Sequence, residues 1–386
     1  MMESLAKSSA DPTLRDAGRA LDARPLPVPA RLLAGIAMRL RRWLLALADQ
    51  VVPAPVALFE QLAGHMQTPA IGAVARRRIA DLLAAGPLSA AELAARTGLD
   101  ADRLRRTMRG LATVGIFARD ADGRFRNNRK SAVLLSGAAI SLRDCAAYFS
   151  SRSHLHAWAD FERTLESGQN AFERVHGMSS WDWFDTHPEE GAVFAGTMVG
   201  LTRLLAPGIA AAYPFAEIDR LCDVGGGHGT LLAEVLLRHQ RLRGVLFDSA
   251  AVLADARLFL AARGIAEPRV ELVAGSFFEQ VPAGCDAYLL KNVLHDWDDE
   301  RALRILGNCR RAMLPGHRLL VVESVVEDGT TRGHGPLADL QMMVVCCEGR
   351  ERGRGELADL FARSGFRLAR VLPMPGPVSV IEGRAV

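Results

Sequence analysis

Apolar residues recur with two different periods along the chain, and the change of period divides it into two parts. From about residue 30 to residue 200 the spacing of apolar residues is helical almost throughout. From about residue 218 short apolar runs alternate with helical segments, which is typical of an α/β domain with a doubly wound, Rossmann-like parallel sheet. We expect a polar, disordered leader over residues 1–28, a mostly helical domain over 29–200 and the α/β domain over 201–386.

The helical part contains the pattern of a winged helix-turn-helix module. Its three helices are predicted at Val74–Ala85, Leu88–Thr97 and Arg103–Val114. Ser89 and Glu92 have the spacing of a capping box at the start of the second helix. Two short alternating runs then flank Asp122-Gly123, a dipeptide that favours a β-hairpin turn. Three helices followed by a hairpin predict a winged-helix fold.

Arginines on the third helix of this module make nucleic-acid binding one interpretation. They are Arg103, Arg105, Arg106 and Arg109. Asp100 and Asp102 at the start of the same helix would repel phosphate, and the formal net charge of the whole chain is only +3. We therefore expect a packing or dimerisation platform and no nucleic-acid partner. The alternative is a winged-helix regulator that responds to a ligand.

Apolar runs in the second part are predicted to be strands, with helices between them. The strands are Arg220–Val224, Gly244–Phe247, Val270–Val273, Ala287–Leu290, Arg318–Val326, Leu368–Leu372 and Val378–Ile381. The helices are Thr230–His239, Ala251–Arg263, Asp298–Met313 and Gly355–Ser364. Ligands of such sheets bind at the carboxyl ends of the parallel strands, so the residues that follow the strands are the candidates for a functional site.

A glycine-rich segment joins the first of these strands to the next helix and reads Asp223-Val224-Gly225-Gly226-Gly227-His228-Gly229. Glycine allows the backbone to turn sharply and to approach a ligand closely. A phosphate-binding loop would need a lysine here, and a nicotinamide fingerprint would need glycine at the position of Thr230. The acid followed by glycines suits a ligand with a charged amine and a nucleoside, such as S-adenosylmethionine.

Asp248 ends the second strand, 25 positions after Asp223. An acid at this place faces the crevice of a doubly wound sheet and can accept both ribose hydroxyls of a nucleoside. The alternative is that Asp248 caps the helix that follows from Ala250. With the glycine-rich segment beside it, we favour the ribose interpretation.

Two titratable residues follow the neighbouring strands. His295 comes after the fourth strand, in the run Lys291-Asn292-Val293-Leu294-His295-Asp296-Trp297, and Glu323 comes within the fifth. A lone histidine is more often structural than catalytic, but this one follows the carboxyl end of a parallel strand. An acid in an apolar strand is costly to bury without a partner. We therefore expect Glu323 to pair with His295.

Three stretches carry a resemblance to a known family: DVGGGHG, GSFFEQVPAGCDAYLLKNVLHDWDDE and GRERG. From about Leu58 onward the sequence resembles the S-adenosylmethionine-dependent O-methyltransferases of the plant caffeate type, which include bacterial phenazine, carotenoid and polyketide tailoring enzymes. The resemblance implies a homodimer held by the helical domain and a methyltransferase domain that binds S-adenosylmethionine. The implied acceptor is a hydroxyl of an aromatic or polyketide-like small molecule.

The resemblance also implies roles for individual residues. His295 is the general base, and Glu323 and Glu351 flank its imidazole. The positions that bind the cofactor are Gly225, Gly227, Asp248, Lys291 and Trp297. Asp223, the acid of the glycine-rich segment, is expected to bind it as well. The positions that line the acceptor pocket are Met198, Met342 and Cys346.

The sequence departs from the family pattern at two positions. Ser276 replaces the aspartate that precedes Phe277 near the adenine, so these two residues are expected at the cofactor without a charge. Gly353 replaces a threonine in the loop that holds Glu351. Some relatives in this family hydroxylate or decarboxylate their substrates instead of methylating them. Such relatives tend to lack the base, so His295 favours methyl transfer over this alternative.

Cysteine usage and hydropathy bear on the location of the protein. The six cysteines show no CxxC pair and no spacing suited to zinc, which indicates a reducing cytoplasm and no metal. The most membrane-like stretch, Ala30–Ala48, is interrupted by Arg31, Arg39, Arg41 and Arg42. We expect an amphipathic helix that packs on a partner, and no stable membrane insertion.

Overall fold

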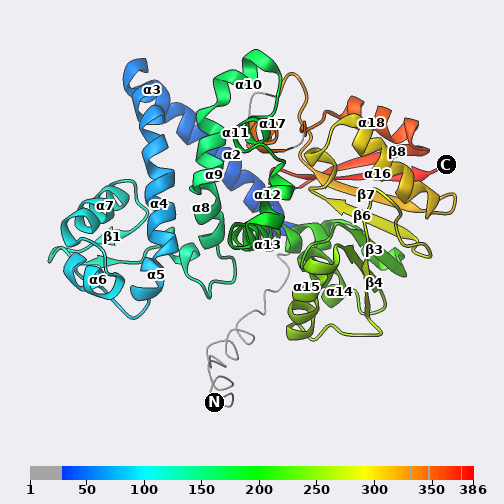
Figure 1. Ribbon diagram of the computed structural model, residues 1–386, viewed down its shortest axis with the longest axis horizontal. Helices are drawn as coiled ribbons and strands as arrows, with labels where there is room; N and C mark the ends of the chain where they lie inside the picture. The colour runs from blue at the N-terminus through cyan, green and yellow to red at the C-terminus, as the bar shows by residue number, and fades with distance from the viewer. Residues whose placement is uncertain (1–27, 331–332, 347, 375) are drawn as a thin grey trace.

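The computed structural model describes residues 28–330, 333–346, 348–374 and 376–386 (Figure 1). The leader predicted over 1–28 lies outside these residues except for Val28, where the first described helix begins. The helices of the N-terminal part are α2 (Val28–Val51), α3 (Ala54–Ala63), α4 (Gln67–Arg76), α5 (Ile79–Leu82), α6 (Ala90–Thr97), α7 (Ala101–Thr113), α8 (Arg143–Phe149), α9 (Arg152–Ala159), α10 (Phe161–Ser167), α11 (Ala171–His176), α12 (Ser180–Thr186) and α13 (Pro188–Ala212). Short 3₁₀ turns are η1 (Gly64–Met66), η2 (Ser131–Leu134), η3 (Phe215–Glu217) and η4 (Leu294–Asp296).

The predicted winged-helix module is confirmed, with one helix broken. Helices α6 and α7 are followed by the hairpin of β1 (Ala118–Arg119) and β2 (Phe125–Arg126). At the start of α6 the capping box is present, since Ser89 Oγ accepts from Glu92 N–H at 3.2 Å and Glu92 Oε2 accepts from Ser89 N–H at 2.6 Å. The single helix predicted over Val74–Ala85 is wrong. Arg78 adopts a left-handed φ of 53°, which ends α4 and turns the fully buried Ile79 into the core of the module.

The arginines of α7 lie beside acids rather than forming an unpaired basic face. Asp100 caps the helix by accepting from Arg103 N–H at 2.8 Å. The ion pairs are Arg103 with Asp100 at 3.7 Å, Arg105 with Asp102 at 2.5 Å and Arg106 with Asp102 at 4.0 Å. These side chains are exposed, so three of the four arginines that suggested nucleic-acid binding belong to a solvated ion-pair network.

A seven-stranded sheet forms the centre of the C-terminal part, in the order β5-β4-β3-β6-β7-β9-β8. The strands are β3 (Arg220–Val224), β4 (Arg243–Asp248), β5 (Val270–Ala274), β6 (Ala287–Lys291), β7 (Arg318–Glu323), β8 (Phe366–Pro373) and β9 (Ser379–Ala385). The first five run parallel, but β9 is antiparallel to β7 and to β8. The expectation of a wholly parallel sheet is therefore wrong at this edge. Five positions between β8 and β9 are too few for a crossover helix, so they join the strands as a hairpin.

Helices cover both faces of the sheet, as the doubly wound prediction requires (Figure 1). They are α14 (Thr230–Arg238) and α15 (Ala250–Ala262) on one face and α16 (Asp299–Arg311) and α18 (Arg354–Arg363) on the other. Helix α17 (Gly335–Val345), which was not predicted, packs on α9, α10 and α11 instead of on the sheet. Successive strand residues enter different cores because the side-chain period of a strand is two. Leu221 and Leu289 share a core with α13, α14 and α15, while Cys222 and Tyr288 share another with α16 and α18.

Helix α13 runs through the boundary predicted at residues 200 and 201. Near its middle Gly196 and Gly200 approach the segment of α8 so closely that a Cβ would lie 2.3 Å from Asp144 Oδ2 and 2.5 Å from Ser141 O, respectively. Its last turns belong to the core of the sheet domain through Ala206 and Ile209. Among the described residues, α13 rather than Ala30–Ala48 is the helix long and apolar enough to cross a membrane, and it packs on α8, α12 and α14.

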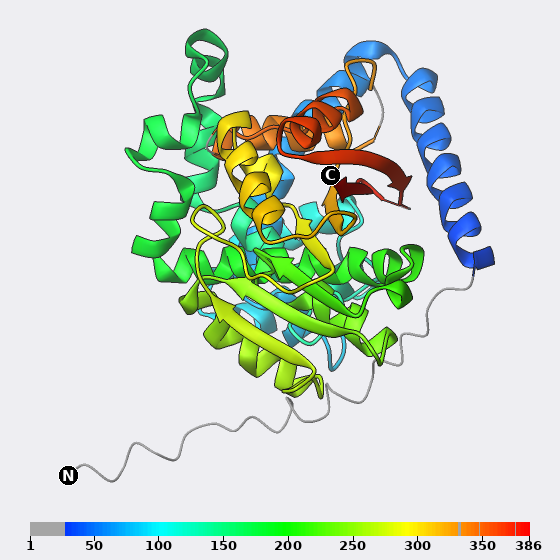
Figure 2. The same cartoon turned by 90° about the vertical axis from the view of Figure 1, so that its right-hand side faces the viewer.

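Helix α2 stands apart from the rest of the chain (Figure 2). It is followed by a short connection and by α3, which leads into the winged-helix module. Every residue from Ile36 to Val51 is exposed, on all sides of the helix. The amphipathic helix expected over Ala30–Ala48 is therefore present, and the described part of the same chain does not cover it.

Candidate active site

The site lies where the carboxyl ends of four neighbouring strands meet. Strand β3 ends at the glycine-rich segment, β4 ends at Asp248, β6 ends at Lys291 and β7 ends at Glu323. The strands are in parallel register, with Val224 opposite Phe247 and β6 beside both β3 and β7. The sheet therefore places the predicted residues from four distant parts of the sequence at one edge.

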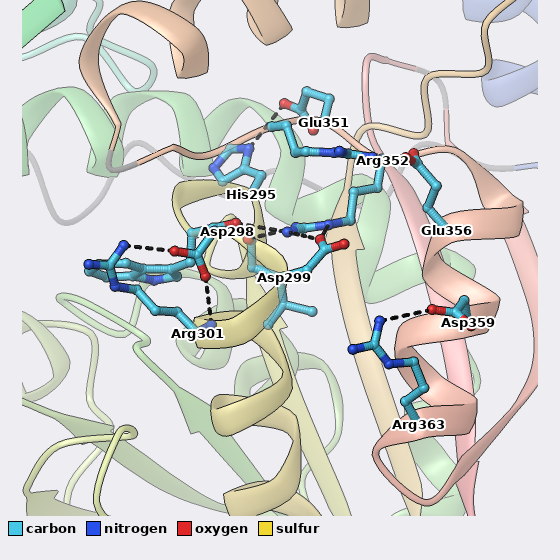
Figure 3. Close-up of polar contacts among 12 residues, drawn as sticks. His295, Asp298, Asp299, Arg301, Glu351, Arg352, Glu356, Asp359 and Arg363 are labelled. Atoms are coloured by element: carbon cyan, nitrogen blue, oxygen red, sulfur yellow. Dashed lines mark hydrogen bonds and ion pairs between the residues drawn. The ribbon is translucent and has the colours of Figure 1, made fainter. Parts of the chain in front are cut away.

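His295 lies on the 3₁₀ turn η4, just beyond the end of β6. The turn begins after Asn292, which adopts a left-handed φ of 53° and reverses the chain direction. The His295 side chain is buried, and its Nδ1 lies 3.0 Å from Oε1 of Glu351 (Figure 3). On the other side of the ring, Nε2 lies 3.3 Å from Asn292 Nδ2 and 3.5 Å from Oδ1 of Asp296. The imidazole is thus held at one nitrogen by a carboxylate that is also buried.

Glu323 contacts the backbone around His295 rather than its imidazole. Its Oε1 accepts from His295 N–H at 3.1 Å and from Val293 N–H at 3.3 Å. The carboxylate is 1% exposed, so these amides stabilise it and at the same time fix the turn that carries the histidine. The prediction that Glu323 and Glu351 both flank the ring is therefore wrong for Glu323, whereas Glu351 lies where it was expected.

Buried carboxylates change the titration of His295. Burial alone would lower the pKa of the imidazole, but Asp296 foremost, and then Glu351 and Glu323, raise it to about 9. The same burial raises the pKa of Asp296 and of Glu323 above the ordinary carboxyl value. Asp296, which was not predicted, follows His295 directly in the sequence, and this adjacency is the signal that could have indicated it.

Arg352 joins the loop of Glu351 to the turn of His295 (Figure 3). Its side chain is 0% exposed and donates to the carbonyl oxygens of Leu294 and Trp297 at 2.9 Å and 2.8 Å. It also donates to Asp299 Oδ1 from Nε at 2.9 Å and from a terminal nitrogen at 2.8 Å. The two carbonyls lie on either side of His295, so this guanidinium fixes the backbone of the turn. Its position within GRERG, beside Glu351, was the signal available in the sequence.

Gly353 starts α18 without the threonine of the resembled family. Glu356 Oε2 accepts from Gly353 N–H at 2.8 Å, and Glu327 Oε1 accepts from Arg354 N–H at 2.8 Å. A Cβ at Gly353 would lie 2.9 Å from Glu327 Oε2. The carboxylate of Glu327 therefore occupies the space beside Gly353 and supplies a cap for the helix, which explains how the loop keeps its shape with glycine here.

The glycine-rich segment and Asp248 form the second half of the site. Gly225 and Gly227 have positive φ angles of 68° and 58°, and the space where a Cβ of Gly227 would point is open. Asp248 accepts from Gly227 N–H at 2.8 Å and from Ser249 N–H at 2.7 Å. The N-cap of α15 is Ser249, so Asp248 is not the helix cap that was considered as the alternative. It holds the glycine-rich segment in place at the tip of β4.

Asp223 has an oxygen without a partner among the described residues. Its side chain is buried and Oδ2 accepts no hydrogen bond. Burial raises the pKa of Asp223 to about 7, against the effect of Lys291, whose own pKa burial lowers to about 8. Lys291 donates to Asn292 Oδ1 at 2.8 Å instead. A cationic ligand beside Asp223 would satisfy the oxygen and favour its charged form, which fits the amine and sulfonium of S-adenosylmethionine.

Aromatic side chains line the approach to the glycine-rich segment. A Cβ at Gly225 would lie 3.4 Å from the ring of Phe277, and Phe277 contacts Trp297 edge to face at 6.4 Å between ring centres. The Nε1 of Trp297 is buried without a hydrogen-bond partner among the described residues. Ser276 Oγ accepts from Phe278 N–H at 3.3 Å and so stabilises the turn after β5. Apolar rings around this segment suit a flat base such as adenine.

One of the three predicted acceptor residues, Cys346, contacts the histidine turn, and a second, Met342, lies in the same apolar cluster as Cys346. Cys346 Sγ donates to Asp296 Oδ1 at 3.4 Å, and Cys346 and Met342 belong to an apolar cluster with Trp158 and Trp183. The cluster joins α9, α11 and α12 to α17, so both parts of the chain contribute to it. Met198, on α13, is half-buried and lies outside this cluster. No group of three or more His, Cys, Asp or Glu residues in the described ranges could hold a metal ion.

Known proteins share both parts of this architecture. The O-methyltransferase domain matches residues 158–367, and the O-methyltransferase dimerisation domain matches residues 59–137. Phenazine O-methyltransferase PhzM of Lysobacter antibioticus is 38% identical over 335 residues, which cover 87% of this chain and 97% of that protein. An 8-amino-8-demethylriboflavin N,N-dimethyltransferase of Streptomyces davaonensis is 37% identical over 316 residues, 81% of this chain and 90% of that protein.

A solved structure connects the likeness to the methyl donor. The O-methyltransferase NcsB1 from neocarzinostatin biosynthesis, in complex with S-adenosylmethionine and 2-hydroxy-5-methyl naphthoic acid, superposes with a TM-score of 0.71 at 34% identity. The superposition covers 83% of this chain and 96% of that chain. The match to the dimerisation domain supports a homodimer. With both domains and more than four fifths of its length in common with such enzymes, the chain belongs to the O-methyltransferase family and uses S-adenosylmethionine.

Proposed function

We propose that the protein methylates a hydroxyl group of an aromatic small molecule, with His295 as the general base. The observation that carries the proposal is the buried imidazole anchored at Nδ1 by Glu351 at 3.0 Å. When Nδ1–H donates to this carboxylate, the lone pair of the neutral ring is on Nε2. Relatives named for phenazine and naphthoate O-methylation act on aromatic hydroxyls, which supports this class of acceptor.

The carboxylates around His295 reduce the cost of proton transfer. A phenol has a pKa near 10 and a free imidazole near 6.5, so full transfer to an ordinary histidine costs about 5 kcal/mol. With the pKa of His295 at about 9, the mismatch is about one pKa unit, or about 1.4 kcal/mol. The proton moves from the acceptor hydroxyl to Nε2, and the resulting imidazolium is stabilised by Glu351 at Nδ1 and by Asp296 beside Nε2.

The remaining contribution of the chain is positioning. S-adenosylmethionine supplies an electrophilic methyl group on its sulfonium when it is bound. Asp223 and Asp248 would hold its amine and ribose, and the rings of Phe277 and Trp297 would exclude water from the adenine side. The cluster around Met342 would hold the acceptor ring so that its oxygen faces the methyl group. Such alignment of two reactants typically contributes several kcal/mol to lowering a barrier.

The pH dependence of kcat/KM tests the role of His295. Because its pKa is raised to about 9, His295 of the free enzyme is mostly protonated at pH 7, and kcat/KM is expected to rise about tenfold from pH 7 to pH 8 and about fivefold more from pH 8 to pH 9. Glu351→Gln removes a charge that raises this pKa, so the rise is expected to shift by at least about one unit toward lower pH, with a lower maximum. Initial rates are measured with whichever of a panel of hydroxylated phenazines and naphthoates the wild type turns over.

Glu300→Gln is the matched control for this experiment. Glu300 is exposed in the first turn of α16, and its substitution is expected to leave the profile of the wild type unchanged. A wild-type profile that is flat from pH 6 to pH 9, or a Glu351→Gln profile that keeps the wild-type midpoint, would contradict proton transfer to His295.

Calorimetric titration tests the proposed nucleoside contact of Asp248. Two hydrogen bonds from a charged carboxylate to ribose hydroxyls are worth about 3 kcal/mol, so Asp248→Ala is expected to weaken binding of S-adenosylmethionine about a hundredfold. The affinity for S-adenosylhomocysteine should fall by the same factor, because this product has the same ribose and differs only in lacking the methyl group and, with it, the sulfonium charge. Asp359→Ala, which alters an exposed i,i+4 pair with Arg363, serves as the control. Equal affinities for the wild type and Asp248→Ala would exclude the ribose role.

A further inference from the structure

One face of α2 carries an apolar stripe that the described part of its own chain leaves exposed. The side chains at helical spacing along this face are Ile36 (50% exposed), Leu40 (52%), Trp43 (60%), Leu44 (50%), Leu47 (42%) and Val51 (76%). The rest of the helix surface carries the charged residues Arg39, Arg41, Arg42 and Asp49, together with the exposed Met38 (51%) and Leu45 (48%). A helix that concentrates its apolar side chains on one side and its charges on the others is suited to lie against another surface with its apolar side.

The described part of its own subunit gives α2 little packing beyond its neighbour α3. All residues from Ile36 to Val51 are exposed, and Figure 2 shows α2 as a rod beside the body of the molecule. An isolated helix is only marginally stable in water, and most helices in proteins are stabilised by packing of their apolar face. Contiguous exposed apolar side chains of this extent mark an interaction surface. The structure of one chain therefore leaves α2 without the contact that would stabilise it.

The apolar stripe continues into a surface that is already assigned to dimerisation. After α2, the exposed apolar residues of α3 and η1 include Leu58 (58%), Phe59 (69%), Leu62 (62%) and Met66 (58%). The matched dimerisation domain begins at Phe59, so three of these four residues lie inside it. Pro53 separates α2 from α3 by a short turn, and α2 lies outside the matched domain. Exposed apolar residues therefore continue along the chain from α2 through α3 into the matched domain.

We propose that α2 is an arm that packs on the second subunit of the homodimer. The stripe from Ile36 to Val51 lies against the partner, next to the contact that α3 makes, and the arginines of the opposite side face water. The arm adds to an interface that the dimerisation domain already forms, so it increases the affinity of the two subunits for each other. This proposal does not depend on the identity of the acceptor or on the role of His295.

Two leucines of α2 provide a matched pair of variants. Leu47 lies on the apolar stripe and is 42% exposed, whereas Leu45 lies on the opposite side and is 48% exposed. Leu47→Asp is expected to raise the dissociation constant of the full-length dimer at least about tenfold, because it places a charge in the interface. Leu45→Asp makes the same chemical change two residues away and is expected to leave the dissociation constant unchanged. Both constants are measured by sedimentation of the purified proteins across nanomolar to micromolar concentrations.

Hydrogen exchange of the wild-type dimer gives a second, mutation-free measurement. The amides of residues 36–51 are expected to be protected in the dimer and to lose protection when the protein is diluted to monomer. Fast exchange of these amides at all concentrations, or equal dimer dissociation constants for Leu47→Asp and Leu45→Asp, would overturn the proposal. Flotation with vesicles of anionic phosphatidylglycerol completes the test. Binding to vesicles through Leu47 with an unchanged dimer would assign the stripe to a lipid surface instead.

Discussion

Replacing His295 by alanine lowers kcat about 10²–10⁴-fold, the usual contribution of a positioned general base. The residual rate comes from the alignment of donor and acceptor, which the substitution leaves in place. Since the variant must use an acceptor that has already lost its proton, its rate is expected to keep rising with pH toward the pKa of a phenol, near 10. The affinity for S-adenosylmethionine is expected to stay within about twofold, because the proposed amine and ribose contacts, Asp223 and Asp248, lie on other strands.

His317→Ala is the control for this prediction. His317 is half-buried immediately before β7, at the edge of the sheet opposite to the site, and accepts from Leu314 N–H at 3.3 Å. Its variant is expected to keep the wild-type kcat. Single-turnover measurements at saturating donor and acceptor separate the chemical step from product release. A His295→Ala enzyme with more than half of the wild-type single-turnover rate would exclude the general-base role.

Replacing Arg352 by alanine lowers the free energy of unfolding by about 2–5 kcal/mol. The carbonyls of Leu294 and Trp297 each lose a donor in a buried place, and an unsatisfied buried group costs about 1–3 kcal/mol. The space left by the guanidinium adds a cavity cost. Asp299 contributes less, because its side chain is 46% exposed and regains water when Arg352 is removed. The free energy of unfolding of Arg352→Lys is expected to lie between those of the wild type and Arg352→Ala, because one ammonium cannot reproduce the planar fork that reaches both carbonyls.

Arg363→Ala is the matched control for Arg352→Ala. Arg363 lies on α18 and pairs with Asp359 at 3.2 Å, with side chains 52% and 61% exposed (Figure 3). An exposed pair of this kind contributes about 0–1 kcal/mol. Urea titrations of the wild type and of the three variants give the comparison. Equal unfolding free energies for Arg352→Ala and the wild type would show that water replaces the guanidinium at both carbonyls without cost.

The sequence predicted the strands, and the positions that gather at one edge of the sheet, because each follows from a local pattern. The glycine-rich segment, Asp248 and His295 each follow an apolar run, and parallel strands bring such positions to one edge of a sheet. What the pattern could not supply was the direction of individual side chains. Glu323 was correctly expected near His295, but a buried carboxylate requires only hydrogen-bond donors, whichever groups supply them. Backbone amides satisfy it as well as an imidazole would.

Contacts between distant segments account for the other differences. The break at Arg78 depends on how Ile79 packs in the winged-helix module, which no helical period reveals. Arg352 acts through carbonyls 58 and 55 positions away in the chain, although the GRERG motif that contains it was recognised. The antiparallel edge of the sheet follows from a short connection between β8 and β9. Period and composition specify the elements, and tertiary packing decides how they are joined.

The passage of α13 through both parts of the chain ties their stability together. Gly196 and Gly200 bring the helix against the segment of α8, whereas Ala206 and Ile209 lie in the core beneath the sheet. If either part unfolds, α13 loses some of its packing, and the other part loses a helix that packs in its core. The apolar cluster shared by α9, α11 and α17 is a second connection between the two parts. We therefore expect the unfolding of the two parts to be coupled, so that a loss of stability in one part also lowers the stability of the other.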